Sequence, residues 1–144
     1  LADFAPLVTL AAIIVVFGFL ATEFFSLGTI SQTLKRGAVL AIVSTGLTFV
    51  LLCAEIDLSV GTMALLAACI CGVLWEQPFA AGPKGLGTGS AADVLLVISI
   101  PFVVALALGW ASGSLTVSSG LPSFIITLAM MNIAIGLAKF LTLS

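Results

Sequence analysis

The polar residues of this chain fall into a few short stretches that separate long apolar runs. The first run, residues 4–22, is close to the roughly 20 residues that a membrane-spanning helix needs. Residues 23–37 are amphipathic and hold the only adjacent basic pair, Lys35 and Arg36, which is typical of a helix lying in the membrane interface. The pattern therefore predicts one span followed by one interfacial segment.

The next apolar stretch, residues 38–75, is too long for a single span. One helix of that length would extend about 57 Å at about 1.5 Å per residue, nearly twice a hydrocarbon core of about 30 Å. The only break signal is "AEIDLSVGT", where Asp57 can cap the next helix by accepting a hydrogen bond from the amide of Ser59 or Val60. We therefore predict a helix break near Glu55 and Asp57, with Glu55 at the surface or in a cavity.

The second half of the chain repeats the alternation of apolar runs and short polar stretches. Residues 76–93, rich in glycine and proline, predict a loop outside the bilayer. A fourth span is predicted over residues 94–115, with a kink at Pro101, and a fifth over residues 124–140 after a short turn. The expected fold is all-α, a polytopic transmembrane helix bundle of about five spans.

Composition strengthens the membrane assignment and excludes other classes. Apolar residues make up 62% of the 144 residues, and charged residues only 7%, against roughly 25% in soluble domains. The net charge of −2 argues against nucleic-acid binding, because the chain has no basic stripe that could displace counterions from the phosphates of a nucleic acid. The absence of His and the scattered acids and cysteines predict no metal, no cofactor and no catalytic site. The chain by itself is therefore not expected to be an enzyme.

Two features of the later spans have a packing interpretation and a functional one. Ala105, Gly109 and Gly113 recur every four residues, so one face is nearly bare and suits close helix packing or a dimer seam, unless the spacing is chance. Asn132 lies at the centre of the fifth span. Its amide predicts either an interhelical hydrogen bond or a group lining a polar path.

Because no catalytic groups are found, the functions that remain for this chain are those of a transporter, a channel or a scaffold. An acid beside a helix break inside a membrane often marks a solute pathway, although a cap explains Asp57 without any solute. A secondary transporter would add an inverted repeat of broken helices, and only one break is visible. The candidates for a polar path, each of which can instead be a packing group, are Ser44, Thr45, Thr48, Asp57, Ser59, Thr127 and Asn132.

Two motifs carry a family resemblance. "EIDLSVGT" and "SGLPSFIITLAMMNIAIGLA", in this order with a span between them, resemble the permease subunit of bacterial ABC importers for simple sugars of the ribose, xylose and arabinose type. The resemblance covers residues 34–144. The chain departs from the family pattern at four positions. Ala54 and Ala129 stand where the family has glycine, Ser112 where it has asparagine, and Ile135 where it has arginine. These departures leave the particular sugar open.

The resemblance implies a function and a set of partners. Residues 1–144 would form a transmembrane permease domain that matches the N-terminal half of such a permease, either as a piece of a longer chain or as a half-length relative. The family's C-terminal half holds the segment that docks on the ATPase. Implied partners are a second permease copy, a cytoplasmic ATP-binding subunit, a periplasmic or lipid-anchored sugar-binding protein and the lipid of the bacterial inner membrane.

Overall fold

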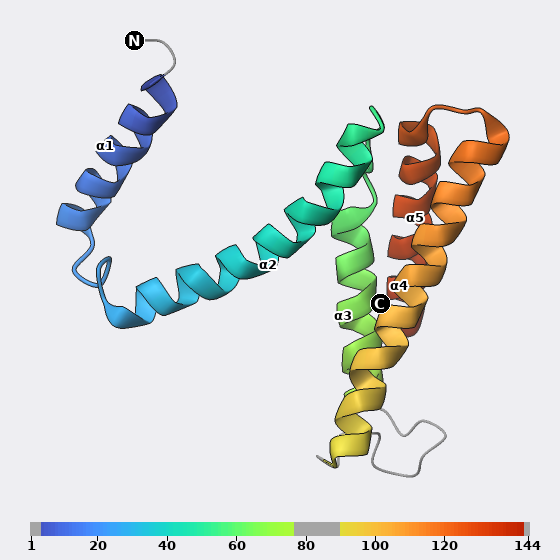
Figure 1. Ribbon diagram of the computed structural model, residues 1–144. Helices are drawn as coiled ribbons and strands as arrows, with labels where there is room; N and C mark the ends of the chain where they lie inside the picture. Colours follow the sequence, from blue (N-terminus) through green and yellow to red (C-terminus); the bar gives the residue numbers. More distant parts are fainter. Residues whose placement is uncertain (1–3, 77–89, 143–144) are drawn as a thin grey trace. The chain divides into compact units, whose positions relative to one another are not determined.

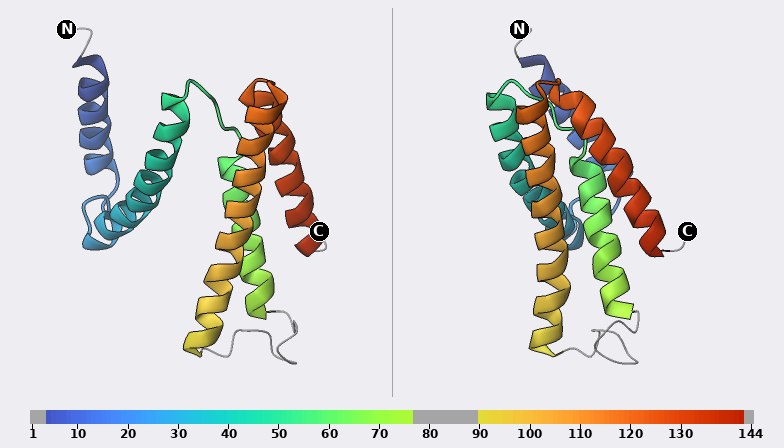
Figure 2. Two further views of the ribbon diagram at one scale, coloured as in Figure 1. Left: turned by 45° about the vertical axis from the view of Figure 1, so that its right-hand side comes forward. Right: turned by 90° about the vertical axis from the view of Figure 1, so that its right-hand side faces the viewer.

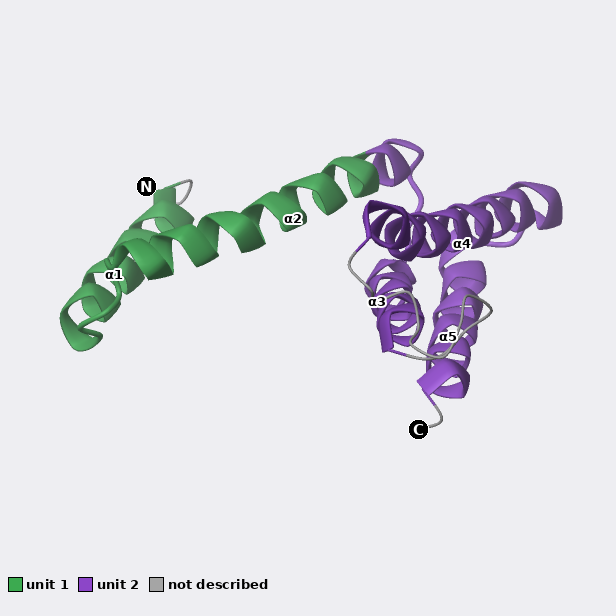
Figure 3. Cartoon of the chain, turned by 90° about the horizontal axis from the view of Figure 1, so that it is seen from below, with its two compact units in different colours: residues 1–48 green, residues 49–144 purple. Residues whose placement is uncertain are grey.

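The computed structural model describes residues 4–76 and 90–142, which form five α-helices and no strand (Figure 1). The all-α prediction is confirmed. The helices are α1 (Ala5–Leu20), α2 (Leu27–Leu52), α3 (Val60–Glu76), α4 (Ala91–Ser119) and α5 (Ser123–Thr142). They divide into two compact units, residues 1–48 and residues 49–144, coloured separately in Figure 3 and treated separately below.

The first unit holds α1, a tight turn and most of α2. The turn is closed by hydrogen bonds such as Phe24 N–H to the Ala21 carbonyl at 3.0 Å, and the rings of Phe24 and Phe25 meet edge to face with centroids 5.1 Å apart. A Cβ on Gly18 would lie 2.6 Å from the Phe25 ring, so a side chain there would clash. Glycine at this position lets the aromatic turn fold back on α1.

The predicted boundary between an interfacial segment and a second span is wrong. A single helix, α2, runs without interruption from Leu27 to Leu52 and includes Lys35 and Arg36. It begins after Ser26, whose hydroxyl oxygen accepts from the Thr29 amide at 3.1 Å, the usual N-cap geometry. No proline follows that would interrupt the helix, and the change from amphipathic to apolar composition does not itself end helical hydrogen bonding.

The second unit is a bundle in which α3 packs against both α4 and α5 (Figure 2). One buried cluster joins Leu66 of α3 to Ala134 and Ala138 of α5. The second joins Leu74 of α3 to Val97 of α4. Ala134 and Ala138 are four residues apart and almost fully buried, at 0% and 4% exposure, so small side chains allow α3 and α5 to approach closely.

Helix α4 is longer than predicted at both ends. It is capped by Ser90, whose hydroxyl oxygen accepts from the Asp93 amide, and it continues through the buried Pro101. It stops at Gly120, whose φ of +64° is the left-handed conformation typical of a glycine after a helix. The predicted turn is therefore shorter, and α5 starts at Ser123. Most of the predicted loop, residues 77–89, lies outside the described residues.

Three of the described helices are long and apolar enough to cross a membrane: α2, α4 and α5. Helices α1 and α3 have 16 and 17 residues, at or just below the lower end of the range of roughly 17–25 residues for spanning helices. The structure thus describes five helices where five spans are predicted, and the predicted interfacial segment is part of α2 rather than a helix of its own. That α1 and α3 also cross the membrane remains a prediction.

Candidate functional site

The helical structure is interrupted where the sequence predicts, between α2 and α3. The end of α2 has a defined geometry. Two hydrogen bonds close it, from Glu55 N–H to the Val50 carbonyl at 3.2 Å and from Ala54 N–H to the Leu51 carbonyl at 2.9 Å. Ala54 has a φ of +58°. This pair of bonds around a left-handed residue is a Schellman motif, in which glycine normally takes the left-handed position.

We expect Ala54→Gly to stabilise the protein by about 1 kcal/mol, because the left-handed conformation costs a residue with a Cβ about 1–2 kcal/mol and costs glycine almost nothing. The midpoint of unfolding by SDS in mixed micelles would measure it. Ala38→Gly, inside helix α2, is the matched control and should destabilise by about 1 kcal/mol. A loss of stability in both variants would contradict the left-handed assignment at Ala54.

The start of α3 is organised by Asp57 and Ser59. The Asp57 Oδ1 atom accepts from the Ser59 amide at 2.8 Å and from the Ser59 hydroxyl at 2.7 Å. The predicted bond to the Ser59 amide is confirmed, but Asp57 lies two residues before the helix-capping position. Ser59 takes that position, because its carbonyl accepts the first helical bond from Met63 N–H at 2.9 Å. The Asp57 charge also lies near the positive end of α3.

We expect Asp57→Ala to lower the stability of the protein by about 1–2 kcal/mol, because the Ser59 amide and hydroxyl lose their charged acceptor. Asp57→Asn should keep most of that stability, because its amide oxygen can accept both hydrogen bonds from Ser59. The amount of folded protein extracted from membranes into mild detergent would check this. Equal losses in the two variants would show that the site needs the negative charge and not only the acceptor.

Helix α5 holds the broken segment through a pair of hydroxyls that we call the hydroxyl clamp, Ser123 and Thr127. The Ser123 hydroxyl accepts from Ile56 N–H at 3.0 Å and donates to the Ile56 carbonyl at 3.1 Å. The Thr127 hydroxyl donates to the same carbonyl at 3.3 Å. The two residues are one helical turn apart and share a face. The clamp thus supplies hydrogen bonds that Ile56 cannot make within a helix.

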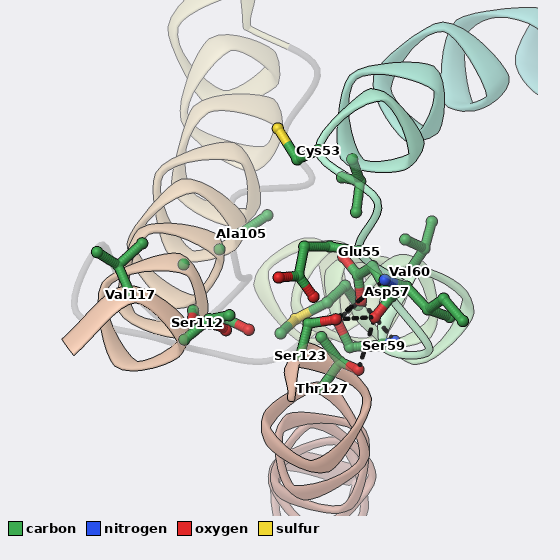
Figure 4. Close-up of a pocket in the computed structure, with 16 residues that line it drawn as sticks. Cys53, Glu55, Asp57, Ser59, Val60, Ala105, Ser112, Val117, Ser123 and Thr127 are labelled. Atoms are coloured by element: carbon green, nitrogen blue, oxygen red, sulfur yellow. Dashed lines mark hydrogen bonds between the residues drawn. The ribbon is translucent and has the colours of Figure 1, made fainter. Parts of the chain in front are cut away.

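A pocket of about 570 Å³ opens beside the clamp, within the second unit (Figure 4). Its volume lies within the roughly 300–1,000 Å³ typical of small-molecule sites. Its walls come from the end of α2, the broken segment and helices α3, α4 and α5. The lining residues are Val50, Cys53, Glu55, Ile56, Asp57, Ser59, Val60, Met63, Ala105, Gly109, Ser112, Gly113, Thr116, Val117, Ser123 and Thr127.

Part of the predicted polar path lies at this pocket and part does not. Asp57, Ser59 and Thr127 line it. Three other candidates, Ser44, Thr45 and Thr48, belong to the first unit and are not among the lining residues. The hydroxyls of Thr45 and Thr48 donate to carbonyls of α2 itself, at 2.8 Å.

Asn132 is not at the pocket either. It is exposed on α5, and its side-chain amide donates to the Leu128 carbonyl one turn earlier at 2.8 Å. The predicted interhelical hydrogen bond is therefore wrong for the part of the chain that the structure describes. A polar side chain can satisfy its donor on its own helix, and sequence position alone does not distinguish the two partners.

The small-residue stripe of α4, Ala105, Gly109 and Gly113, faces the pocket. A Cβ added at Gly109 or Gly113 would meet nothing within 4 Å, so no other described helix packs closely on these glycines. Close packing occurs instead at Ala134 and Ala138 of α5. Packing of the stripe against a second copy of the chain remains a prediction.

Sequence reasoning missed several residues that line the pocket. Ser112 and Thr116 lie on the same face of α4 as the stripe, three and seven residues after Gly109. Ser123, at the start of α5, was not considered although it lies one turn before Thr127. Helical periodicity around the residues already chosen would have identified all three.

The pocket surface is mainly apolar, with a few polar groups and no positive charge. Glu55 and Asp57 contribute carboxylates, and Ser59, Ser112, Thr116, Ser123 and Thr127 contribute hydroxyls, while no lining residue is Lys or Arg. Residues 4–76 and 90–142 contain no group of three or more acids or cysteines that could hold a metal ion. The arrangement suits a solute rich in hydroxyl groups and disfavours an anion.

Comparison with known proteins assigns the family. The model of a family described as the branched-chain amino acid transport system permease component matches residues 29–144. The chain belongs to this permease family. Membership of this family and the three long apolar helices together make the permease a membrane protein. No solved structure matches it significantly.

The curated relatives of the permease confirm the resemblance to sugar importers. It is 31% identical over 142 residues to the ribose import permease protein RbsC of Haemophilus influenzae, covering 97% of this chain and 38% of the relative. The fructose import permease protein FrcC of Rhizobium meliloti is 32% identical (90% and 33% covered), and the xylose transport system permease protein XylH of Escherichia coli is 34% identical (84% and 29% covered). The chain therefore spans about a third of the length of these relatives.

Proposed function

We propose that this permease is the multi-pass membrane subunit of an ATP-driven importer of a monosaccharide or a similar small polar solute in the bacterial inner membrane. The observation that carries the proposal is the pocket at the helix break, where carboxylates and hydroxyls gather in an otherwise apolar chain. Relatives named for ribose, fructose and xylose import support this solute class. These sugars are all neutral and rich in hydroxyl groups.

In this mechanism the permease supplies the path and partner subunits supply the energy and the solute. Two permease copies form the path, and a periplasmic or lipid-anchored sugar-binding protein delivers the sugar. A cytoplasmic ATP-binding subunit hydrolyses ATP, so the permease itself needs no catalytic residue and no cofactor. The solute and the partners can move the bundle between inward-facing and outward-facing states only through different affinities for the two.

The second candidate solute is a branched-chain amino acid, which the family description names. It is a zwitterion, and although its ammonium group could pair with an acid of the lining, its carboxylate would need a cation or a free helix N-terminus. The lining contains no Lys or Arg, and the Asp57 carboxylate already lies at the start of α3. The charge of the pocket therefore favours the sugar. A secondary transporter and a non-transporting scaffold are the alternatives outside the importer class.

The test is to co-express the full-length permease with its genomic neighbours, purify it in mild detergent and identify what co-purifies by mass spectrometry. The complex, reconstituted into vesicles, is then assayed for uptake of labelled ribose, xylose, fructose and leucine. We expect a stoichiometric ATP-binding subunit and ATP-dependent sugar uptake. Uptake of leucine alone would contradict the sugar assignment, uptake driven by an ion gradient would indicate a secondary transporter, and no uptake would leave a scaffold.

A further inference from the structure

Two polar side chains at the pocket have no partner within the described chain. Ser112 is only 7% exposed and lines the pocket, yet its hydroxyl makes no hydrogen bond with any described residue. The half-buried Glu55 carboxylate likewise has neither a hydrogen bond nor an ion pair there. Figure 4 shows the Glu55 side chain directed from the broken segment toward α4, the helix that carries Ser112.

The other polar groups of the pocket are already engaged in holding the fold. The Asp57 carboxylate accepts from Ser59, and the hydroxyl clamp binds the backbone of Ile56. The Thr116 hydroxyl donates to the Ser112 carbonyl at 2.9 Å. Among the described residues, no side-chain nitrogen or oxygen that is closed off from solvent lacks a hydrogen-bond partner, so the Ser112 hydroxyl is open to the pocket. The unpaired hydroxyl and carboxylate are therefore the groups that remain free to bind a solute.

Electrostatics narrow the class of solute. Both charged residues of the lining are acids, so an anion would be repelled. The positive end of α3, which could attract an anion, already has the Asp57 carboxylate beside it. The rest of the lining is largely apolar or small, including Val50, Met63 and Val117. Such a lining suits the C–H faces of a compact neutral solute whose hydroxyls need only a few polar contacts.

We propose that Glu55 and Ser112 bind hydroxyl groups of a neutral, monosaccharide-sized polyol in this pocket, an inference that rests on the proposed function. The Glu55 carboxylate accepts a hydrogen bond from one or two hydroxyls of the solute, a charge-assisted contact. The Ser112 hydroxyl donates to another hydroxyl or accepts from it. Glu55 thereby disfavours solutes that carry a carboxylate or phosphate.

The test uses Cys53, an exposed thiol at the pocket rim, in the full-length importer complex. Alkylation of Cys53 by N-ethylmaleimide is followed by mass spectrometry while ribose, xylose or fructose is titrated, with Cys71 as an internal reference. We expect the transported sugar to slow alkylation of Cys53 and not of Cys71. Glu55→Gln should raise the half-protecting sugar concentration about tenfold, and Ser112→Ala about fivefold, as expected for losing a charged and a neutral hydrogen bond.

Matched controls separate this effect from general damage. Glu76→Gln and Ser118→Ala make the same chemical changes on α3 and α4 outside the pocket lining, and they should leave the half-protecting concentration unchanged. If the wild-type complex imports a sugar but that sugar fails to protect Cys53, the inference is overturned while the proposed function stands. Unchanged protection in both pocket variants, or stronger protection by an organic cation, would also overturn it. Absence of sugar uptake by the wild type would defeat the proposed function itself.

Discussion

Gly109→Leu is expected to reduce solute uptake by about tenfold or more, because the leucine side chain occupies space that the solute needs. A loss of about 1.4 kcal/mol in the free energy of solute binding is enough for each factor of ten. Gly109 lines the pocket, and a Cβ added there meets no atom within 4 Å. A leucine side chain can therefore extend into the open space without displacing the wall. The fold should survive the change while the space for the solute does not.

Uptake by reconstituted vesicles, normalised to the amount of folded permease, measures this effect. Gly109→Ala adds one methyl group and should retain most of the uptake. Gly72→Leu is the positional control, since Gly72 is exposed on α3, also has open space around it and is not part of the pocket. Full uptake by folded Gly109→Leu would show that the solute passes elsewhere. Loss of the permease dimer in this variant would instead support the packing seam.

The fold could be predicted from the sequence wherever a length limit or a helix-ending signal decided the outcome. The run over residues 38–75 is too long for one span, and the position of its acids located the break to within a few residues. The start of α2 was misjudged, because amphipathicity describes where a helix lies and not where it ends. The left-handed Ala54 was not predicted, since alanine is a strong helix former. The one signal for it was the glycine that the family pattern has at this position, because glycine normally takes the left-handed position after a helix.

The site was less predictable, because its residues meet through tertiary contacts. Asp57 and Ser59 are neighbours in sequence, so their bond could be foreseen. The bonds from Ser123 and Thr127 to Ile56 join residues 67 and 71 positions apart. Likewise, a bare face on α4 suits both a helix partner and a solute, and only the three-dimensional arrangement shows that it faces a pocket.

Removing the hydroxyl clamp is expected to destabilise the protein by more than the sum of its parts. Ser123→Ala takes away the acceptor for Ile56 N–H and should cost about 2 kcal/mol, since an unpaired amide inside a membrane protein is not reliably rescued by water. Thr127→Val should cost at most about 1 kcal/mol, because Ser123 still donates to the Ile56 carbonyl. With both hydroxyls gone, both backbone groups of Ile56 lose their partners on α5.

A double-mutant cycle on SDS unfolding midpoints would measure the coupling between the two hydroxyls. Residues that share one partner are expected to couple by about 0.5 kcal/mol or more. Thr33→Val is the matched control, because its hydroxyl bonds only a carbonyl of its own helix. Additive losses in the double variant would mean that the two hydroxyls act independently on Ile56. Coupling would instead show that the two hydroxyls of α5 hold Ile56 together. The segment around Ile56 lines the pocket without regular secondary structure, so these hydrogen bonds from α5 are what fix its backbone.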